Sequence, residues 1–384
     1  MRNVHIVGIG QTPVREHWNK GIRELGVEAV LAAMDDAQLD GVDALYAGNM
    51  LSGMLSGQEN LGALLAEYAG MPGIEAVKVE AACGSAAAAF RQAVLAVGSG
   101  AVDSAVAVGV EKLTELSGSA TTHGLATASD ADYEASMGLS FVAINALLMR
   151  RYMHEFGVTK ADFAPFVINA HRNAAHNPNA MFRYPVTTEA YRDAKVIADP
   201  INLLDSSPIG DGAAAVVVMA ADSGVAVPTT PLRVTACEMG TDTIAVDNRE
   251  NPMWLKGVER SASRAMKRAG KAHGDIDLFE IHDAFSIITA LSLEASGFVE
   301  YGKAVSWVSD ARVAIDGELP LATFGGLKGR GHPVGATGLY QIVEAALQLR
   351  GDAPGAIQVS DARCAMAQNI GGSGANVITT ILER

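Results

Sequence analysis

The feature that most constrains this fold is an alternation of short apolar runs with amphipathic segments, which occurs twice along the chain. Apolar runs predict strands, and a 3.6-residue spacing of apolar positions predicts helices. In the first half, strands are expected at residues 4–9, 43–47, 77–80 and 104–110, and helices at 22–37 and 84–97. The run at 104–110 is rich in Val and Ala, which suits a strand buried on both faces. The pattern predicts an α/β fold.

The second half repeats this order of elements. A strand at 232–237 and a helix at 258–269 are followed by an acidic turn and a short apolar strand, as in the first half. A glycine-rich turn then precedes a helix expected at 338–349, and the last strands are expected at 364–368 and 376–382. The period is far too long for a solenoid. We interpret the chain as two duplicated halves, residues 1–225 and 226–384.

Residues from about 112 to 205 interrupt the pattern of the first half. This region is rich in polar connections and contains one long helical pattern, at 141–156. Long polar connections in a compact domain typically form lids or binding loops. We expect this inserted region to cover a site.

Composition narrows the class of protein. With 384 residues, of which 49% are hydrophobic, the chain can bury a large core. A formal charge of −14 and an aromatic content of 5% argue against nucleic acid as a partner. No run of about 18 apolar residues and no signal-peptide pattern occurs, so we expect no membrane association. The three cysteines, Cys83, Cys237 and Cys364, favour free thiols and a cytoplasmic location.

Cys83 lies where a strand-like run gives way to a run of alanines, in VEAACGSAAAAF. A thiol at a helix N-terminus faces unpaired N–H groups and the positive end of the helix dipole, which favour the thiolate. A small buried apolar residue is the alternative interpretation, and the position alone leaves both open.

Three further segments carry candidate chemistry. The glycine-dense GGLKGRGHPVGATG (residues 325–338) places His332 just before a helix, where the backbone can approach a ligand closely. EIHDAF (280–285) places His282 and Asp283 at a strand end, where ligands of α/β folds gather, and a helix-capping Asp283 beside a surface histidine is the alternative interpretation. NIGGSG (369–374) is either an ordinary hairpin turn or a turn that directs an N–H group at a developing oxyanion.

Other chemistries have no matching pattern. The phosphate-loop spacing, the dinucleotide fingerprint, H-E-x-x-H and G-x-S-x-G are all absent. We therefore expect no metal site and no tightly bound cofactor.

Taken together and in order, the four segments resemble the thiolase superfamily over essentially the whole chain. HDAF is similar to the HDCF of the sterol-carrier and archaeal acetoacetyl-CoA thiolases, GHPVGATG to the general-base loop, and NIGGSG to the C-terminal glycine turn. The resemblance implies a five-layer αβαβα sandwich with a loop domain inserted in the first half. It implies an acyltransferase whose substrates are coenzyme A thioesters.

The resemblance also implies roles for single residues. Cys83 would take the acyl group as a thioester, and His332 would deprotonate it. His332 and His282 would bind the thioester oxygen, while the N–H groups of Cys83 and Gly371 would form a second oxyanion hole. The resemblance leaves substrate contacts less defined, and the candidates are Lys328, Arg330, Arg172 and Asn369.

The sequence departs from the family pattern at the second acid/base. Members of the family use a cysteine either within HDCF or just before the glycine turn, and this chain has Ala284 and Asn369 there. Cys364 lies on the same predicted strand as Asn369 but roughly 16 Å away at ~3.3 Å per residue, on the opposite face. Two alternatives therefore stand beside a thiolase: a decarboxylative condensing enzyme or C-acyltransferase with another acceptor, and a non-catalytic acyl-binding subunit.

The resemblance implies partners as well. Members of the superfamily are homodimers or homotetramers. Archaeal-type members often join a small zinc-ribbon/OB-fold protein and a hydroxymethylglutaryl-CoA synthase, and both are expected here on resemblance only.

Overall fold

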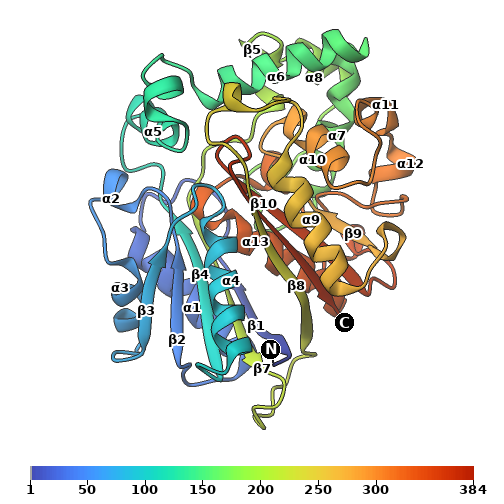
Figure 1. Ribbon diagram of the computed structural model, residues 1–384. Coiled ribbons are helices and arrows are strands. Elements are labelled where there is room, and N and C mark those ends of the chain that lie inside the picture. Colours follow the sequence, from blue (N-terminus) through green and yellow to red (C-terminus); the bar gives the residue numbers. More distant parts are fainter. Residues whose placement is uncertain (1) are drawn as a thin grey trace.

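The computed structural model describes residues 2–384, in which nine strands form one sheet in the order β3-β2-β4-β7-β1-β8-β11-β10-β9 (Figure 1). A separate two-stranded sheet pairs β5 (Val196–Ala198) with β6 (Ile201–Asn202). The strands of the first half are β1 (Val4–Gln11), β2 (Ala44–Gly48), β3 (Glu75–Val79), β4 (Ser104–Glu111) and β7 (Gly212–Ala220). Those of the second half are β8 (Leu232–Thr241), β9 (Leu278–Glu280), β10 (Cys364–Gly371) and β11 (Asn376–Glu383).

The two halves of the sheet meet only where β1 pairs with β8, at His5–Arg233 and Ile6–Leu232. On either side of this joint the strand order is the same: β2-β4-β7-β1 in the first half corresponds to β9-β10-β11-β8 in the second. The counterpart of edge strand β3 is reduced to an isolated bridge between Phe279 and Leu321. The topology repeats in space as the order of elements does along the chain.

Helices separate and cover the two halves of the sheet. Helix α1 (Ile22–Ala37) packs on β1 and β7, and α9 (Lys256–Ala269) packs on β8 and β11. Between them, α4 (Ser85–Ser99) and α13 (Thr337–Arg350) contact each other, α4 on the first half and α13 on β10. Three apolar clusters fill the spaces between these layers. The predicted five-layer sandwich is confirmed.

Helix α4 approaches the sheet unusually closely because the strands beneath it carry glycine. A Cβ atom at Gly109 would lie 2.6 Å from the Cβ of Ala86, well inside contact distance. The alanines of the first turns of α4 are buried in the same way. Small residues on both surfaces therefore fix the position of the helix that follows Cys83.

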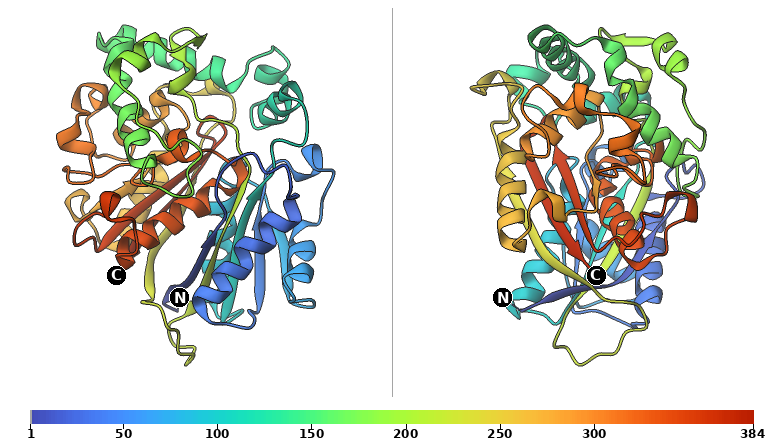
Figure 2. Two further views of the ribbon diagram at one scale, coloured as in Figure 1. Left: turned by 180° about the vertical axis from the view of Figure 1, so that it is seen from behind. Right: turned by 90° about the vertical axis from the view of Figure 1, so that its right-hand side faces the viewer.

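The inserted region lies across one end of the molecule (Figure 2). It contains α5 (Gly118–Ala126), α6 (Phe141–Phe156), α7 (Ala164–Ala174) and α8 (Thr188–Asp193). Its buried aromatic residues, Tyr152, Phe163 and Tyr191, belong to the same apolar cluster as α10 (Ser286–Ala295) of the second half. The helix expected at 141–156 is thus packed against the segment that carries His282.

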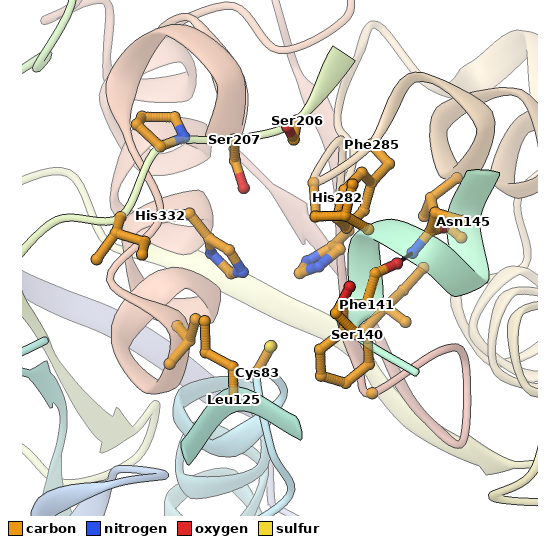
Figure 3. Close-up of a pocket in the computed structure, with 18 of the residues that line it drawn as sticks. Cys83, Leu125, Ser140, Phe141, Asn145, Ser206, Ser207, His282, Phe285 and His332 are labelled. Carbon is orange, nitrogen blue, oxygen red and sulfur yellow. Dashed lines mark hydrogen bonds between the residues drawn. The ribbon is translucent and has the colours of Figure 1, made fainter. Parts of the chain in front are cut away.

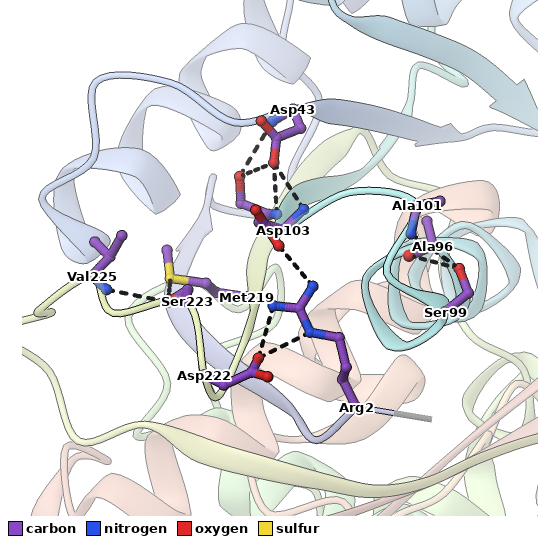
Figure 4. A network of polar contacts seen from close by, with 11 residues as sticks. Arg2, Asp43, Ala96, Ser99, Ala101, Asp103, Met219, Asp222, Ser223 and Val225 are labelled. Atoms are coloured by element: carbon purple, nitrogen blue, oxygen red, sulfur yellow. Dashed lines mark hydrogen bonds and ion pairs between the residues drawn. The ribbon is translucent and has the colours of Figure 1, made fainter.

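The opposite end of the first half is closed by polar contacts (Figure 4). Arg2 donates to Asp103 at 2.7 Å and to Asp222 at 2.7 and 2.9 Å, and Asp43 accepts from the backbone and hydroxyl of Ser104. The partners of Arg2 are exposed, so solvent screens these contacts and each contributes little to stability. No helix within residues 2–384 is both long and apolar enough to span a bilayer.

Candidate active site

Cys83 lies in a tight turn between β3 and α4. Ala82, just before it, has a φ of 52°, a left-handed conformation that is uncommon for a residue with a side chain. The hydroxyl of Ser85 fixes this turn, since it donates to the carbonyl of Ala82 at 2.6 Å and accepts from the N–H of Ala81 at 2.9 Å. The strained turn presents the thiol at the start of α4, as the sequence predicts.

His332 lies in the loop before α13, and its hydrogen bonds define its tautomer. Its Nδ1 lies 2.7 Å from the hydroxyl of Thr337, which donates its only hydrogen to the carbonyl of Pro333 at 3.1 Å. Because that hydroxyl can only accept from the imidazole, Nδ1 carries the proton and Nε2 has a free lone pair. His332 is therefore arranged to act as a base through Nε2.

His282 has the opposite tautomer. Its Nδ1 lies 3.0 Å from the amide nitrogen of Asn369, a group that can only donate. Nδ1 must accept this bond, so the proton of the neutral ring is on Nε2. His282 is therefore arranged to donate a hydrogen bond. It is only 3% exposed, which excludes the surface histidine that the sequence left open.

The structure brings these three side chains into one cavity of about 220 Å³ (Figure 3). The two imidazole rings are nearly perpendicular, with centroids 5.3 Å apart, and the sulfur of Cys83 lies opposite them. Apolar side chains form most of the wall: Leu113, Leu125, Phe141, Val142, Ile209, Phe285, Ile288, Val334 and Ile370. The region from α5 to α6 supplies part of this wall.

The ionisation of the site differs from the expectation for Cys83. Burial, together with the nearby carboxylate of Glu111, raises the pKa of the Cys83 thiol to about 12, although the N–H of Gly372 donates to the sulfur. Burial lowers the pKa of His282 to about 3 and that of His332 well below its usual range. All three groups are neutral at pH 7, so the helix N-terminus does not by itself generate a thiolate.

The C-terminal glycine turn contributes Gly372 to the cavity. Gly372 has a φ of +61° and lines the wall beside Cys83. Gly371, the residue expected in the oxyanion hole, ends β10 one position earlier, with the carbonyl of Ala81 against its Cα. The turn lies where the sequence predicts, and the residue of the turn that lines the cavity is Gly372, one position after Gly371.

Two buried carboxylates hold the segments that carry His282 and His332 in place. Glu111 accepts hydrogen bonds from the N–H groups of Met50, Leu51 and Gly335, and burial raises the pKa of its carboxyl to about 7. It thereby ties the His332 loop to the first half of the sheet. Asp283 accepts from the N–H of Leu327 at 2.6 Å and ties the His282 segment to the same loop.

The structure corrects two predicted substrate contacts. Lys328 is 1% exposed, donates to the carbonyl of Asp283 and pairs with its carboxylate. Arg330 is fully buried, 3.0 Å from Glu344 and stacked on Tyr340. Neither cation reaches solvent, so neither can bind a phosphate of coenzyme A; both stabilise the interior of the His332 loop.

The other candidates lie outside the cavity wall. Asn369 is buried behind His282 and positions that ring. Arg172 on α7 bonds to Asn169 at 2.8 Å and pairs with Asp310 at 3.2 Å. Cys364 and Cys237 are buried in strands.

Sequence reasoning missed three residues of the site: Thr337, Glu111 and Ser207. Thr337 is five residues after His332, at the start of a helix. Within GHPVGATG it is the only hydroxyl residue that follows the histidine, and this could have indicated a hydrogen-bond partner for the ring. Glu111 ends a buried strand, an unusual place for a carboxylate. Ser207 had no signal besides its place in a short polar turn before a proline. Within residues 2–384, no group of three His, Cys, Asp or Glu side chains is suited to a metal ion.

Comparison with known proteins matches both halves of the chain to one family. The family description "Thiolase, N-terminal domain" matches residues 4–222, and "Thiolase C-terminal domain-like" matches residues 239–384. Among curated proteins, an acetyl-CoA acetyltransferase of Methanothermobacter thermautotrophicus is 42% identical, with both chains fully covered. Another, of Methanocaldococcus jannaschii, is 37% identical over all of this chain and 99% of the relative.

Solved structures agree on the fold. A structure described as an Ltp2-ChsH2(DUF35) aldolase matches with a TM-score of 0.86 and 25% identity, over 99% of this chain and 97% of the other. Acetyl-CoA acetyltransferase from Syntrophomonas wolfei matches over the full length of both chains with a TM-score of 0.76 and 18% identity, which bears on the fold alone. With both family models matched and two full-length relatives above 30% identity, the chain belongs to the thiolase family.

Proposed function

We propose that this protein transfers an acetyl group from acetyl-CoA through a thioester on Cys83, forming or cleaving acetoacetyl-CoA. The protein is a thiolase-type acyltransferase, as its family membership and full-length relatives show. One observation carries the assignment of roles: Cys83, His282 and His332 face one cavity, and the two imidazoles have complementary tautomers.

His332 is the base in the proposed first step. The thiol is neutral at rest, so it must lose its proton as it attacks the thioester carbonyl. The free lone pair on Nε2 of His332 takes this proton, and the resulting imidazolium then protonates the departing coenzyme A thiolate. The imidazole is neutral again once the acyl-enzyme has formed.

His282 and the backbone stabilise negative charge. The N–H at Nε2 of His282 donates to the thioester oxygen of the incoming substrate. The N–H groups of Cys83 and of the glycine turn, where Gly372 faces the cavity and Gly371 precedes it, stabilise the oxyanion formed at Cys83. Removing one such donor typically costs a factor of about 10²–10³ in rate.

The expected partners remain proposals. Within residues 2–384, edge strand β3 has no strand on its outer side, and Val77 on it is 45% exposed. These features support a homodimer or homotetramer that continues the sheet. The DUF35 component named in one structural relative supports a second protein as partner, and the zinc-ribbon/OB-fold character of that partner rests on the sequence resemblance. A hydroxymethylglutaryl-CoA synthase partner rests on the sequence resemblance.

A comparison of two reactions tests the proposed function. The purified protein should cleave acetoacetyl-CoA with coenzyme A, and the Cys83→Ser and His332→Ala variants should lose this activity by more than about 10²-fold. Decarboxylation of malonyl-CoA without thiolysis would instead identify a decarboxylative condensing enzyme. Absence of both reactions would contradict the proposal.

A further inference from the structure

The cavity wall opposite Cys83 is a short segment, residues 206–209, held on both sides by catalytic segments. Ser206 forms a β-bridge with Phe285, and the N–H of Ser207 donates to the carbonyl of Ala284 at 2.9 Å. At the other end, Ile209 forms a β-bridge with His332. Ser207 is therefore fixed between the backbone of the His282 segment and that of the His332 loop.

The side chain of Ser207 points into the cavity. Its hydroxyl is directed toward the space between the two imidazoles, with Cys83 on the far side (Figure 3). Its backbone is bonded to Ala284, the position at which the family pattern places a catalytic thiol. The hydroxyl of Ser207, which can transfer a proton, thus lies on the residue bonded to Ala284, whose own side chain cannot.

We propose that Ser207 relays the α-proton of the second substrate to His332, in place of the absent catalytic cysteine. This inference rests on the proposed function, because it concerns the carbon–carbon step that follows formation of the acyl-enzyme. A neutral serine hydroxyl is too weakly basic to be the final proton acceptor. It transfers its own proton to a neighbouring base as it accepts another.

The proton balance closes with one imidazole. After coenzyme A has left, His332 is neutral, as described above. The α-carbon–hydrogen bond of the second acetyl-CoA then breaks, its proton passes to Oγ of Ser207, and the serine proton passes to Nε2 of His332. The carbanion attacks the acyl carbonyl, the carbon–sulfur bond to Cys83 breaks, and the imidazolium protonates the Cys83 thiolate. Acetoacetyl-CoA and the resting enzyme result.

Three measurements on the full chain separate this role from a structural one. The first measures acylation of Cys83 by acetyl-CoA from the intact mass of the protein. The second measures exchange of the acetyl-CoA methyl protons in deuterium oxide by mass spectrometry, and the third measures acetoacetyl-CoA thiolysis by absorbance. The variants are Ser207→Ala, the conservative Ser207→Thr, and the double variant Ser207→Ala/Ala284→Cys, which restores a thiol at the usual position.

We expect Ser207→Ala to slow methyl-proton exchange and thiolysis by about 100-fold or more, with acylation within about threefold of wild type. Ser207→Thr and the double variant should each recover at least about a tenth of wild-type exchange. If Ser207→Ala exchanged methyl protons at the wild-type rate, the inference would be overturned. An equal loss of acylation and exchange would also overturn it, because such a loss indicates a binding or structural role. Failure of the wild type to acylate Cys83 would instead contradict the proposed function.

Discussion

The amide nitrogen of Asn369 donates a hydrogen bond to Nδ1 of His282 over 3.0 Å. Asn369 lies near the end of β10, at the position where other family members have a cysteine. The contact therefore joins this end of β10 to the histidine of the HDAF segment. Asn369, at a position where the family pattern has a thiol, thus sets the tautomer of the ring of His282. The replacement changes the role of the position from chemistry to positioning.

The Asn369→Leu substitution tests this positioning role. Leu has a similar volume and no donor, so Nδ1 of His282 loses its partner and the ring is no longer held with its proton on Nε2. We expect kcat for thiolysis to fall by about 10- to 100-fold with little change in KM, since a donor to the transition state is misaligned. A change confined to KM would indicate that Asn369 contacts substrate directly.

The Thr337→Val substitution tests the tautomer of His332. Val has the same shape but cannot accept from Nδ1–H, so the lone pair on Nε2 is no longer enforced. Acylation of Cys83 should slow by about tenfold or more, within the ~10²–10⁴ that a general base contributes. Thr337→Ser, which retains the hydroxyl, is the matched control and should acylate at near the wild-type rate. Equal rates for the Val and Ser variants would refute this assignment.

The raised pKa of Cys83 predicts how the thiol reacts with iodoacetamide. Because only the thiolate reacts and the pKa is raised to about 12, the reactive fraction far below that pH rises about tenfold per pH unit. Labelling of the Cys83 peptide should therefore be slow at pH 7 and accelerate steadily to pH 9. A rate that is fast and independent of pH over this range would show a preformed thiolate–imidazolium pair instead.

The Ser85→Ala substitution tests the strained turn before α4. It removes the hydroxyl that bonds both Ala81 and Ala82, so the N–H of Ala81 loses its side-chain acceptor and the carbonyl of Ala82 keeps only the backbone N–H of Ser85. The free energy of unfolding in urea should fall by about 1–3 kcal/mol. Ser99→Ala, at the exposed end of the same helix, is the control and should change it by less than about 0.5 kcal/mol. Similar losses in both variants would argue against a special role for the turn.

Local patterns in the sequence predicted much of the fold. Helices α1 and α6 begin and end at the predicted residues, because apolar spacing and a following left-handed residue define each end. The duplication was readable because both halves repeat one order of elements. The pairing of β1 with β8, which involves two residues of each strand, could not be predicted, because pairing between distant segments leaves no local pattern in the sequence.

The segments that carry Cys83, His282 and His332 could be located in the sequence because they lie at strand ends and in turns, but the ionisation of these side chains could not be predicted. The pKa of Cys83 depends on burial and on Glu111, which lies on another strand. Lys328 and Arg330 resemble phosphate ligands in sequence, yet their partners Asp283 and Glu344 lie on other segments and bury them. Such long-range pairing decides whether a cation is structural or functional.

The most direct test of the central claim is the intact mass of the protein after incubation with acetyl-CoA. The account predicts one added acetyl group on the wild type, located on the Cys83 peptide and released by free coenzyme A, with none on Cys83→Ser. An unmodified wild type, or an acetyl group that persists in Cys83→Ser, would contradict it.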